Sequence, residues 1–195
     1  MNFIGWRDLI GDVSAKSTGL TSPILHNLNG AYRGWFYSNG NRADISYHIP
    51  HDYALGTDLY IHVHWTYNGT SIEGPLKVSH HLSYAKGHSQ AKFTDEITVN
   101  QVIETAETEP LMHRIDEILV SSNDGRLLDT NLIEPDGIIF NSFIMDSVPT
   151  IVSKDLSLPM IICVDIHYQS TDKSTPQKSP DFYRVDGSDN VPSMH

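Results

Sequence analysis

The sequence contains little cysteine and little positive charge, and both shortages limit what the protein can do. Cys163 is the only cysteine in 195 residues, so no disulfide can form within one chain. Thirteen Lys and Arg residues stand against twenty-four Asp and Glu residues, which gives a formal net charge of -11. Because binding to a phosphate backbone needs clustered positive charge, we do not expect the protein to bind nucleic acid directly.

Long apolar runs and catalytic motifs are missing as well. No stretch approaches the roughly 18 apolar residues of a membrane span, and the first residues lack the pattern of an export signal. We therefore expect cytoplasmic synthesis and no membrane partner. The sequence has no Gly-x-Ser-x-Gly elbow, phosphate-binding loop or dinucleotide fingerprint. These absences predict a protein that is not an enzyme and uses no cofactor.

Strand-type alternation of apolar and polar residues dominates from Arg33 onward. Its clearest example is the segment 57–67, and further strands are expected at 34–37, 44–49, 76–85, 91–104, 111–120, 137–145 and 159–169. Eight such segments predict an all-β fold, an antiparallel β-sandwich of jelly-roll type. The expected core residues on the two clearest strands are Leu59, Ile61, Val63, Trp65, Ile162, Val164 and Ile166.

The two ends of the chain differ from this pattern. Apolar residues near helical spacing predict a short helix within an N-terminal arm of residues 1–28, followed by the sandwich at 29–169. Residues 170–195 are polar and contain proline, so they cannot bury enough apolar area to fold alone and are expected to form an extended tail. We predict that both ends contact a neighbouring subunit through apolar anchors, namely Phe3, Ile4, Trp6, Leu9, Ile10, Phe182, Tyr183 and Val185.

Histidine is abundant, with eleven residues, and four of the polar strand residues raise the question of a metal site. His62 and His64 share one strand face, and Asp165 and His167 share a face of another strand. If these strands were neighbours in register, they would supply the two-histidine, one-carboxylate set that binds iron or zinc. The His-x-His pattern is similar to the start of the cupin metal motif, but the glycine before it and the glutamate after it are missing. We therefore expect a metal-free sheet face or interface, with metal binding as the alternative.

Two further groups of residues have a functional and a structural interpretation. His80 and His81 are adjacent on a strand, so they point to opposite faces and cannot bind one ion together. The strand aromatics suggest either a sugar-binding groove or a sandwich core, and we expect the core. These aromatics are Trp35, Tyr37, Tyr47, Tyr53, Tyr60, Trp65 and Tyr67.

A resemblance to a known family rests on two segments. These are His48-Ile49-Pro50-His51-Asp52-Tyr53 and, after Gly56, the run that ends in His62-Val63-His64-Trp65. Shorter matches are Trp6, Tyr84-Ala85 and Asp165-Ile166-His167-Tyr168. The combination resembles a family of tailed-bacteriophage structural proteins. The resemblance implies a location in the virion, after synthesis in the host cytoplasm, and it implies no catalytic residues.

Within a phage particle, several structural tasks suit an acidic sandwich. We expect a capsid decoration or cement protein that binds the particle as a symmetric homo-oligomer, with a trimer among the candidate states. Its partners would be copies of itself and other virion proteins, such as the major capsid or tail proteins. The alternatives are a tail or fibre adaptor, including a receptor that binds glycans, and a cupin-like metal-binding protein.

Overall fold

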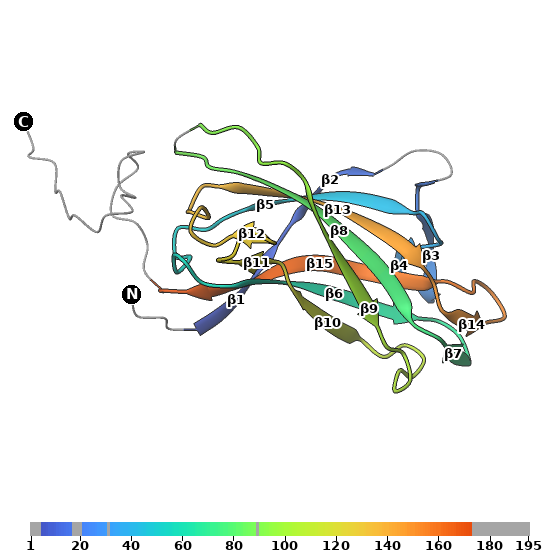
Figure 1. Cartoon of the computed structure of the whole chain (residues 1–195). Coiled ribbons are helices and arrows are strands. Elements are labelled where there is room, and N and C mark those ends of the chain that lie inside the picture. The colour runs from blue at the N-terminus through green and yellow to red at the C-terminus, as the bar shows by residue number, and fades with distance from the viewer. Residues whose placement is uncertain (1–4, 17–20, 31, 89, 173–195) are drawn as a thin grey trace, which may run out of the picture.

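All regular elements of the described chain are β-strands. The structure, a computed structural model, describes residues 5–16, 21–30, 32–88 and 90–172, with side chains of 12–16 excepted (Figure 1). Within those ranges there is no α-helix, and consequently none of the length and apolar character needed to cross a membrane.

Sheet A, the first layer of the sandwich, is antiparallel throughout. Its strands in spatial order are β10 (Arg114–Leu119), β6 (Leu59–Tyr67), β15 (Pro159–Ser170), β4 (Tyr32–Phe36) and β3 (Ile24–Asn29). β1 (Gly5–Ile10) pairs with the far half of β15, beyond the region that β4 occupies. The long strand β15 is therefore the centre of this sheet.

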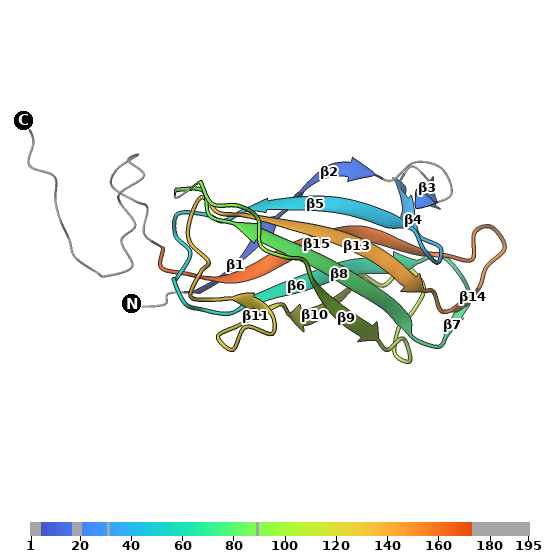
Figure 2. The same ribbon diagram turned by 45° about the horizontal axis from the view of Figure 1, so that its top comes forward.

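Sheet B, the second layer, is also antiparallel. Its strands in order are β2 (Asp12–Lys16), β5 (Arg42–His48), β13 (Ile138–Ser147), β8 (Leu76–Ala85) and β9 (Ile97–Ile103). Two small ladders lie outside it: β7 (Ser71–Glu73) with β14 (Thr150–Val152), and β11 (Ser121–Ser122) with β12 (Leu128–Asp129). Figure 2 shows sheet B in front of sheet A. The prediction of an antiparallel jelly-roll sandwich is confirmed.

The predicted N-terminal helix is wrong, because residues 5–10 and 12–16 form strands of the two sheets. In the strand, Leu9 packs against the core while Trp6 and Ile10 are exposed. This alternation suits a strand that pairs with β15 and buries only one of its faces. The chain crosses from sheet A to sheet B at Gly11. A Cβ atom there would lie 2.4 Å from side-chain atoms of both Ile45 and Tyr47, so the crossing requires glycine.

The core lies between the sheets and contains six of the seven residues predicted for it. Four of them line the inner face of β6, where each is fully buried, and Val164 and Ile166 lie beside them on β15. Ile162 is the exception, because its exposed fraction is 48%. A register shift between Ile161 and Cys163 marks a β-bulge, which turns Ile161 inward and leaves Ile162 outside.

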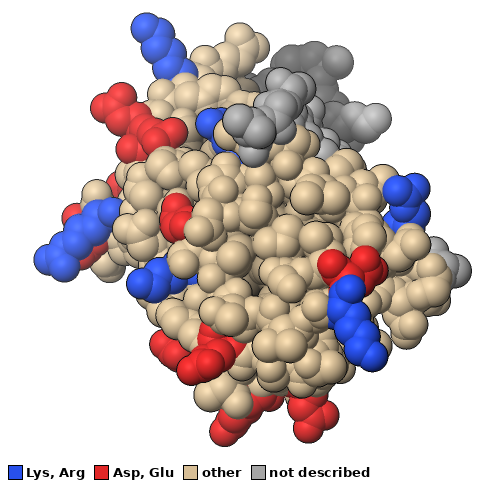
Figure 3. All heavy atoms as spheres, turned by 90° about the vertical axis from the view of Figure 1, so that its right-hand side faces the viewer, with Lys and Arg blue, Asp and Glu red and all other residues tan. Residues whose placement is uncertain are grey.

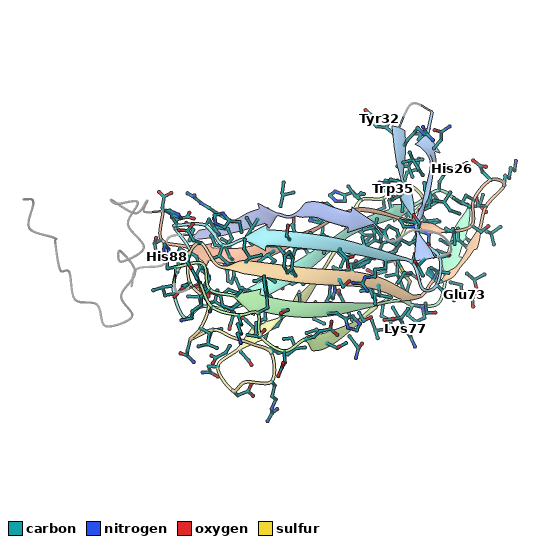
Figure 4. All side chains as sticks on the ribbon, turned by 90° about the horizontal axis from the view of Figure 1, so that it is seen from above. His26, Tyr32, Trp35, Glu73, Lys77 and His88 are labelled. Atoms are coloured by element: carbon teal, nitrogen blue, oxygen red, sulfur yellow. The ribbon has the colours of Figure 1, made fainter. Side chains whose placement is uncertain are left out.

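The two ends of the sandwich look different. The β3–β4 hairpin projects from the body of the sandwich near one end, with Tyr32 at its far end (Figure 4). Figure 3 shows the end that carries β7 and β14, where charged side chains of both signs are scattered. The described residues visible on that end form no continuous basic patch, in keeping with the low content of Lys and Arg.

Candidate metal centre on the outer face of sheet A

The strands that carry the four candidate ligands are neighbours in register. Asp165 of β15 lies directly opposite His62 of β6, and Cys163 lies opposite His64. Directly paired residues of antiparallel strands share a face. Since Ile61, Val63 and Val164 fill the inner face, the histidines and Asp165 lie on the outer face. The condition on which the metal hypothesis depended is met.

Three of these residues form a compact group, the His62–His64–Asp165 cluster. His62 Nδ1 lies 3.6 Å from Asp165 Oδ1, and His64 Nε2 lies 3.2 Å from Asp165 Oδ2. One ligand atom from each side chain lies within 4.8 Å of the others. These distances allow a single ion to contact all three side chains.

His167 belongs to a second, overlapping group with Asp8 of β1. Asp8 Oδ1 lies 3.9 Å from His62 Nδ1 and 4.0 Å from His167 Nε2, and the two imidazole rings are 4.5 Å apart. The predicted set of four is therefore brought together, but His167 faces Asp8 and Glu117 rather than Asp165.

The imidazoles of the cluster are fixed through their other ring nitrogens. His62 Nε2 lies 2.9 Å from Glu117 Oε2 on β10. His64 Nδ1 lies 2.9 Å from His113 Nε2, and these two rings stack with centroids 5.1 Å apart. Both contacts leave the nitrogen that faces Asp165 available as a ligand.

Asp165 is a buried carboxylate, with only 5% of its side chain exposed. Burial, with a further contribution from Asp8, raises its pKa above the ordinary value, although the nearby histidines act in the opposite direction. Its Oδ1 and His64 Nε2 have no hydrogen-bond partner within the described chain. The 3.2 Å contact between the two side chains is thus an electrostatic approach without hydrogen-bond geometry.

Cys163 borders the cluster without taking a catalytic role. Burial raises the pKa of its thiol to about 11, so the side chain stays protonated at neutral pH. A nucleophilic cysteine needs the reverse shift. The bulge places Cys163 on the outer face, where it is partly buried.

The segment that carries the family resemblance makes structural contacts at one end of the sandwich. The carboxylate of Asp136 lies close to three imidazoles. His48 Nε2 and His51 Nε2 are 3.1 and 2.8 Å from its Oδ1, and His88 Nε2 is 2.9 Å from its Oδ2. Figure 4 places His88 at the end opposite Glu73. This network joins the segment 48–53 to two distant loops.

Asp52, in the same segment, joins both ends of the described chain. Its carboxylate accepts hydrogen bonds from Arg7 on β1, at 2.7 Å, and from Tyr168 and Ser170 on β15, at 3.0 and 2.6 Å. Arg7 also pairs with Asp172. Within the resembling segment, this aspartate therefore stabilises the fold rather than presenting a reactive group.

His80, His81 and most of the strand aromatics lie in structural positions. His80 is fully buried while His81 faces outward and pairs with Glu96, so the prediction of opposite faces is confirmed. Five of the aromatics proposed for a sugar groove belong to the core instead: Tyr37, Tyr47, Tyr53, Trp65 and Tyr67. Tyr60 and Trp35 are partly buried.

Only some of the predicted interface residues lie in the described chain. Trp6 and Ile10 are exposed on the outer face of sheet A, with exposed fractions of 42% and 75%, whereas Leu9 packs against the core. The residues outside the described ranges are Phe3, Ile4, Phe182, Tyr183 and Val185. The contacts of all eight with a partner stay a prediction.

Sequence reasoning missed three residues of the site: Asp8, His113 and Glu117. Asp8 was assigned to a helix, and its role depends on the strand pairing of β1. Glu117 shares one face of β10 with the exposed Ile115 and Leu119, while Ile118 packs against the core, so its outward direction was visible in the sequence. Its pairing with His62 was not visible, because it depends on the neighbouring strand β6.

No protein-family model matches the chain, and no curated protein matches its sequence. Similar solved structures include the xylan-binding module CBM15, with 10% sequence identity and a TM-score of 0.37 over 86% of this chain and 97% of that chain. Another is the N-terminal endo-1,4-beta-D-xylanase 10B of Clostridium thermocellum, CBM22-1 and GH10 modules, complexed with xylohexaose. It has 13% identity and a TM-score of 0.39 over 89% of this chain and 30% of that chain. Similarity this distant carries no information on function.

Proposed function

We propose that this chain is a non-enzymatic structural protein of a bacteriophage particle, and specifically a capsid decoration or cement protein that acts as a homo-oligomer. The setting rests on the resemblance of the segments 48–53 and 56–65 to tailed-phage structural proteins. The binding surface rests on one structural observation, the composition of the outer face of sheet A.

That face exposes large apolar side chains around the His62–His64–Asp165 cluster. Ile10 pairs with Asp165, Ile115 with His64 and Leu119 with Tyr60, so the register places all three on the same face as the cluster. The exposed apolar residues of this face are Trp6, Ile10, Ile115, Leu119 and Ile162, each with at least 36% of its surface exposed. Apolar side chains gathered on one face of a soluble protein favour burial against another protein surface.

A second copy of this chain is the occupant that we propose for the face. Acidic and imidazole side chains lie side by side there, as in the contact between Glu117 and His62. The same face of a second copy therefore offers imidazoles to the acidic side chains of the first copy, and acidic side chains to its imidazoles. β10 is the last strand of sheet A on that side, so within the described ranges no strand of the sheet pairs with its outer backbone groups. Such an edge, next to an apolar face, is a surface that symmetric association covers.

Sedimentation of the full chain tests this assignment. We expect the wild-type protein to be an oligomer and the double variant Ile10→Ser, Ile115→Ser to be a folded monomer. Val102→Ser is the matched control, because Val102 is an exposed aliphatic residue of β9 in sheet B, with 57% exposure. A monomeric wild type, or a double variant that associates normally, would show that the face does not join two copies.

Copy number tests the setting. In particles assembled from the genome that encodes this chain, quantitative mass spectrometry should find on the order of hundreds of copies if the protein covers a capsid lattice. About a dozen copies would indicate the tail or fibre adaptor instead, and binding on a glycan array would then identify a receptor-binding part. Complete absence from the particles would contradict the proposal.

A further inference from the structure

We propose that His62, His64 and Asp165 bind a divalent transition-metal ion, with Zn²⁺ as the representative, on the outer face of sheet A. This inference concerns a single chain and does not depend on the proposed function. It reverses our expectation from the sequence, which placed these side chains on a metal-free face.

The spacing of the ligand atoms suits such an ion. Ligands of zinc lie about 2.0 to 2.2 Å from the metal, so two ligands of one tetrahedral ion are roughly 3.4 Å apart. The two oxygens of Asp165 each approach one imidazole near this distance, Oδ2 at 3.2 Å from His64 Nε2 and Oδ1 at 3.6 Å from His62 Nδ1. One ligand atom from each of the three side chains lies within 4.8 Å of the others. Two imidazoles and one carboxylate form the set that favours Zn²⁺ and related ions over Ca²⁺ or Mg²⁺.

The surroundings of the imidazoles also suit a metal site. Metal-binding histidines commonly hold their second ring nitrogen against a carboxylate or another polar group, which fixes the tautomer and the ring direction. Glu117 has this position for His62, and His113 has it for His64, each at 2.9 Å. Both arrangements direct the remaining nitrogen toward Asp165.

Asp165 provides an independent observation. Only 5% of its side chain is exposed, and its Oδ1 has no hydrogen-bond partner in the described chain. A buried carboxylate without hydrogen bonds is costly unless a cation compensates its charge. Asp8 and Glu117 add further negative charge next to the same imidazoles, so the site as a whole attracts a cation.

The ion would keep room for a fourth ligand. Asp8 Oδ1 is one candidate, 3.9 Å from His62 Nδ1, and it belongs to strand β1 at the edge of sheet A. The competing explanation is a protonated imidazole that compensates Asp165 without any metal. A metal-binding measurement separates the two, since a proton-based pair has no need for the ion.

Titration of the chelator-treated, full-length protein with Zn²⁺ tests the site by calorimetry. We expect one equivalent to bind per chain, and we expect the double variant His62→Ala, His64→Ala to bind at least 100-fold more weakly. His81→Ala is the matched control, because His81 is also a strand histidine in contact with an acid, 2.7 Å from Glu96, and its loss should leave the affinity unchanged. The measurement is independent of oligomeric state, because stoichiometry is counted per chain.

Two results would overturn the proposal. One is the absence of stoichiometric binding to the wild-type chain, and the other is binding that survives in the double variant, which would place the ion elsewhere, for example near Asp136. Circular dichroism checks that the variants fold. Co²⁺ absorption of the wild-type protein needs no variant: the intense visible bands of four- or five-coordinate Co²⁺ support the site, and the weak spectrum of hydrated Co²⁺ contradicts it.

Discussion

His80 and the pair His62 and His64 lie in the same sandwich but in opposite chemical surroundings. His80 is fully buried between the sheets, where its Nε2 is 3.3 Å from Gln101 Oε1 and its Nδ1 is 3.3 Å from Asn141 Nδ2. The other two lie on the outer face of sheet A beside the carboxylate of Asp165.

The difference shows how the position on a strand decides the role of a histidine. Neutral amide partners suit a neutral imidazole that accepts from Asn141 and donates to Gln101, so His80 satisfies a polar core without any charge. A buried carboxylate instead favours a cation beside it, either a proton on the imidazole or a metal ion. Three predictions sharpen this contrast between the inner and outer faces.

The largest expected effect comes from the inner face of β6. Trp65 is fully buried, and its Nε1 donates a hydrogen bond of 2.7 Å to Asp116 Oδ2. Trp65→Ala should reduce the free energy of unfolding by about 3 to 5 kcal/mol, as large cavities in cores do. His64→Ala, its neighbour on the outer face, should cost less than about 1 kcal/mol without metal. Urea denaturation measures both, and a loss below about 1 kcal/mol for Trp65→Ala would contradict its place in the core.

The second prediction concerns acid. Burial lowers the pKa of His80 to about 4, while an unfolded histidine has a pKa of 6.5. A base with a lowered pKa in the folded state favours folding above the unfolded pKa, and this stability is lost as the pH falls from about 6.5 to 4. The total loss from this group is about 3 kcal/mol.

The variant His80→Gln isolates this contribution, because glutamine keeps polar groups near Gln101 and Asn141 but does not titrate. We expect the difference in unfolding free energy between wild type and variant to shrink between pH 6.5 and 4, measured by urea denaturation at each pH. Parallel pH curves for the two proteins would mean that His80 does not determine the acid sensitivity.

Local patterns predicted most of the fold. Each of the eight expected strands has a counterpart in the structure. These strands were predictable because the apolar–polar alternation and the turn residues that indicate them are local features of each segment. The strands β1 and β2 were missed because their pairing partners, β15 and β5, lie far away in the sequence. β3 pairs with the adjacent β4, and it was missed because residues 1–28 were assigned to an arm. The bulge between Ile161 and Cys163 was missed for the same reason: an extra residue is visible only against the partner strand β6.

The candidate site, too, was predictable only where it depends on local sequence patterns. Periodicity correctly placed His62 with His64, and Asp165 with His167, on common faces. Whether β6 and β15 are neighbours depends on non-local pairing, which no single segment contains. Asp165 lies between β1 and β6, opposite Ile10 and His62, and its burial there favours a cation at the site.

The smallest expected effect, and the sharpest test of the outer face, comes from Asp165→Asn. Burial raises the pKa of this carboxyl, so the folded state holds its proton more tightly than the unfolded state does. Stability from this group is therefore present at low pH and is lost as the pH rises from the unfolded to the folded pKa. At neutral pH the ionised carboxylate remains as a cost, and the neutral amide removes it. Without metal we expect Asp165→Asn to raise the free energy of unfolding, or to change it by less than about 1 kcal/mol.

Zn²⁺ should separate the two proteins. At about 100 times the dissociation constant, the free energy of unfolding of the wild-type protein should rise by roughly 3 kcal/mol while that of the variant rises little, because only the native site binds the ion. Thermal unfolding with and without Zn²⁺ measures both effects. A clear loss of stability in the metal-free variant would mean that protonated histidines already compensate Asp165, and that the face holds an ion pair rather than a metal site.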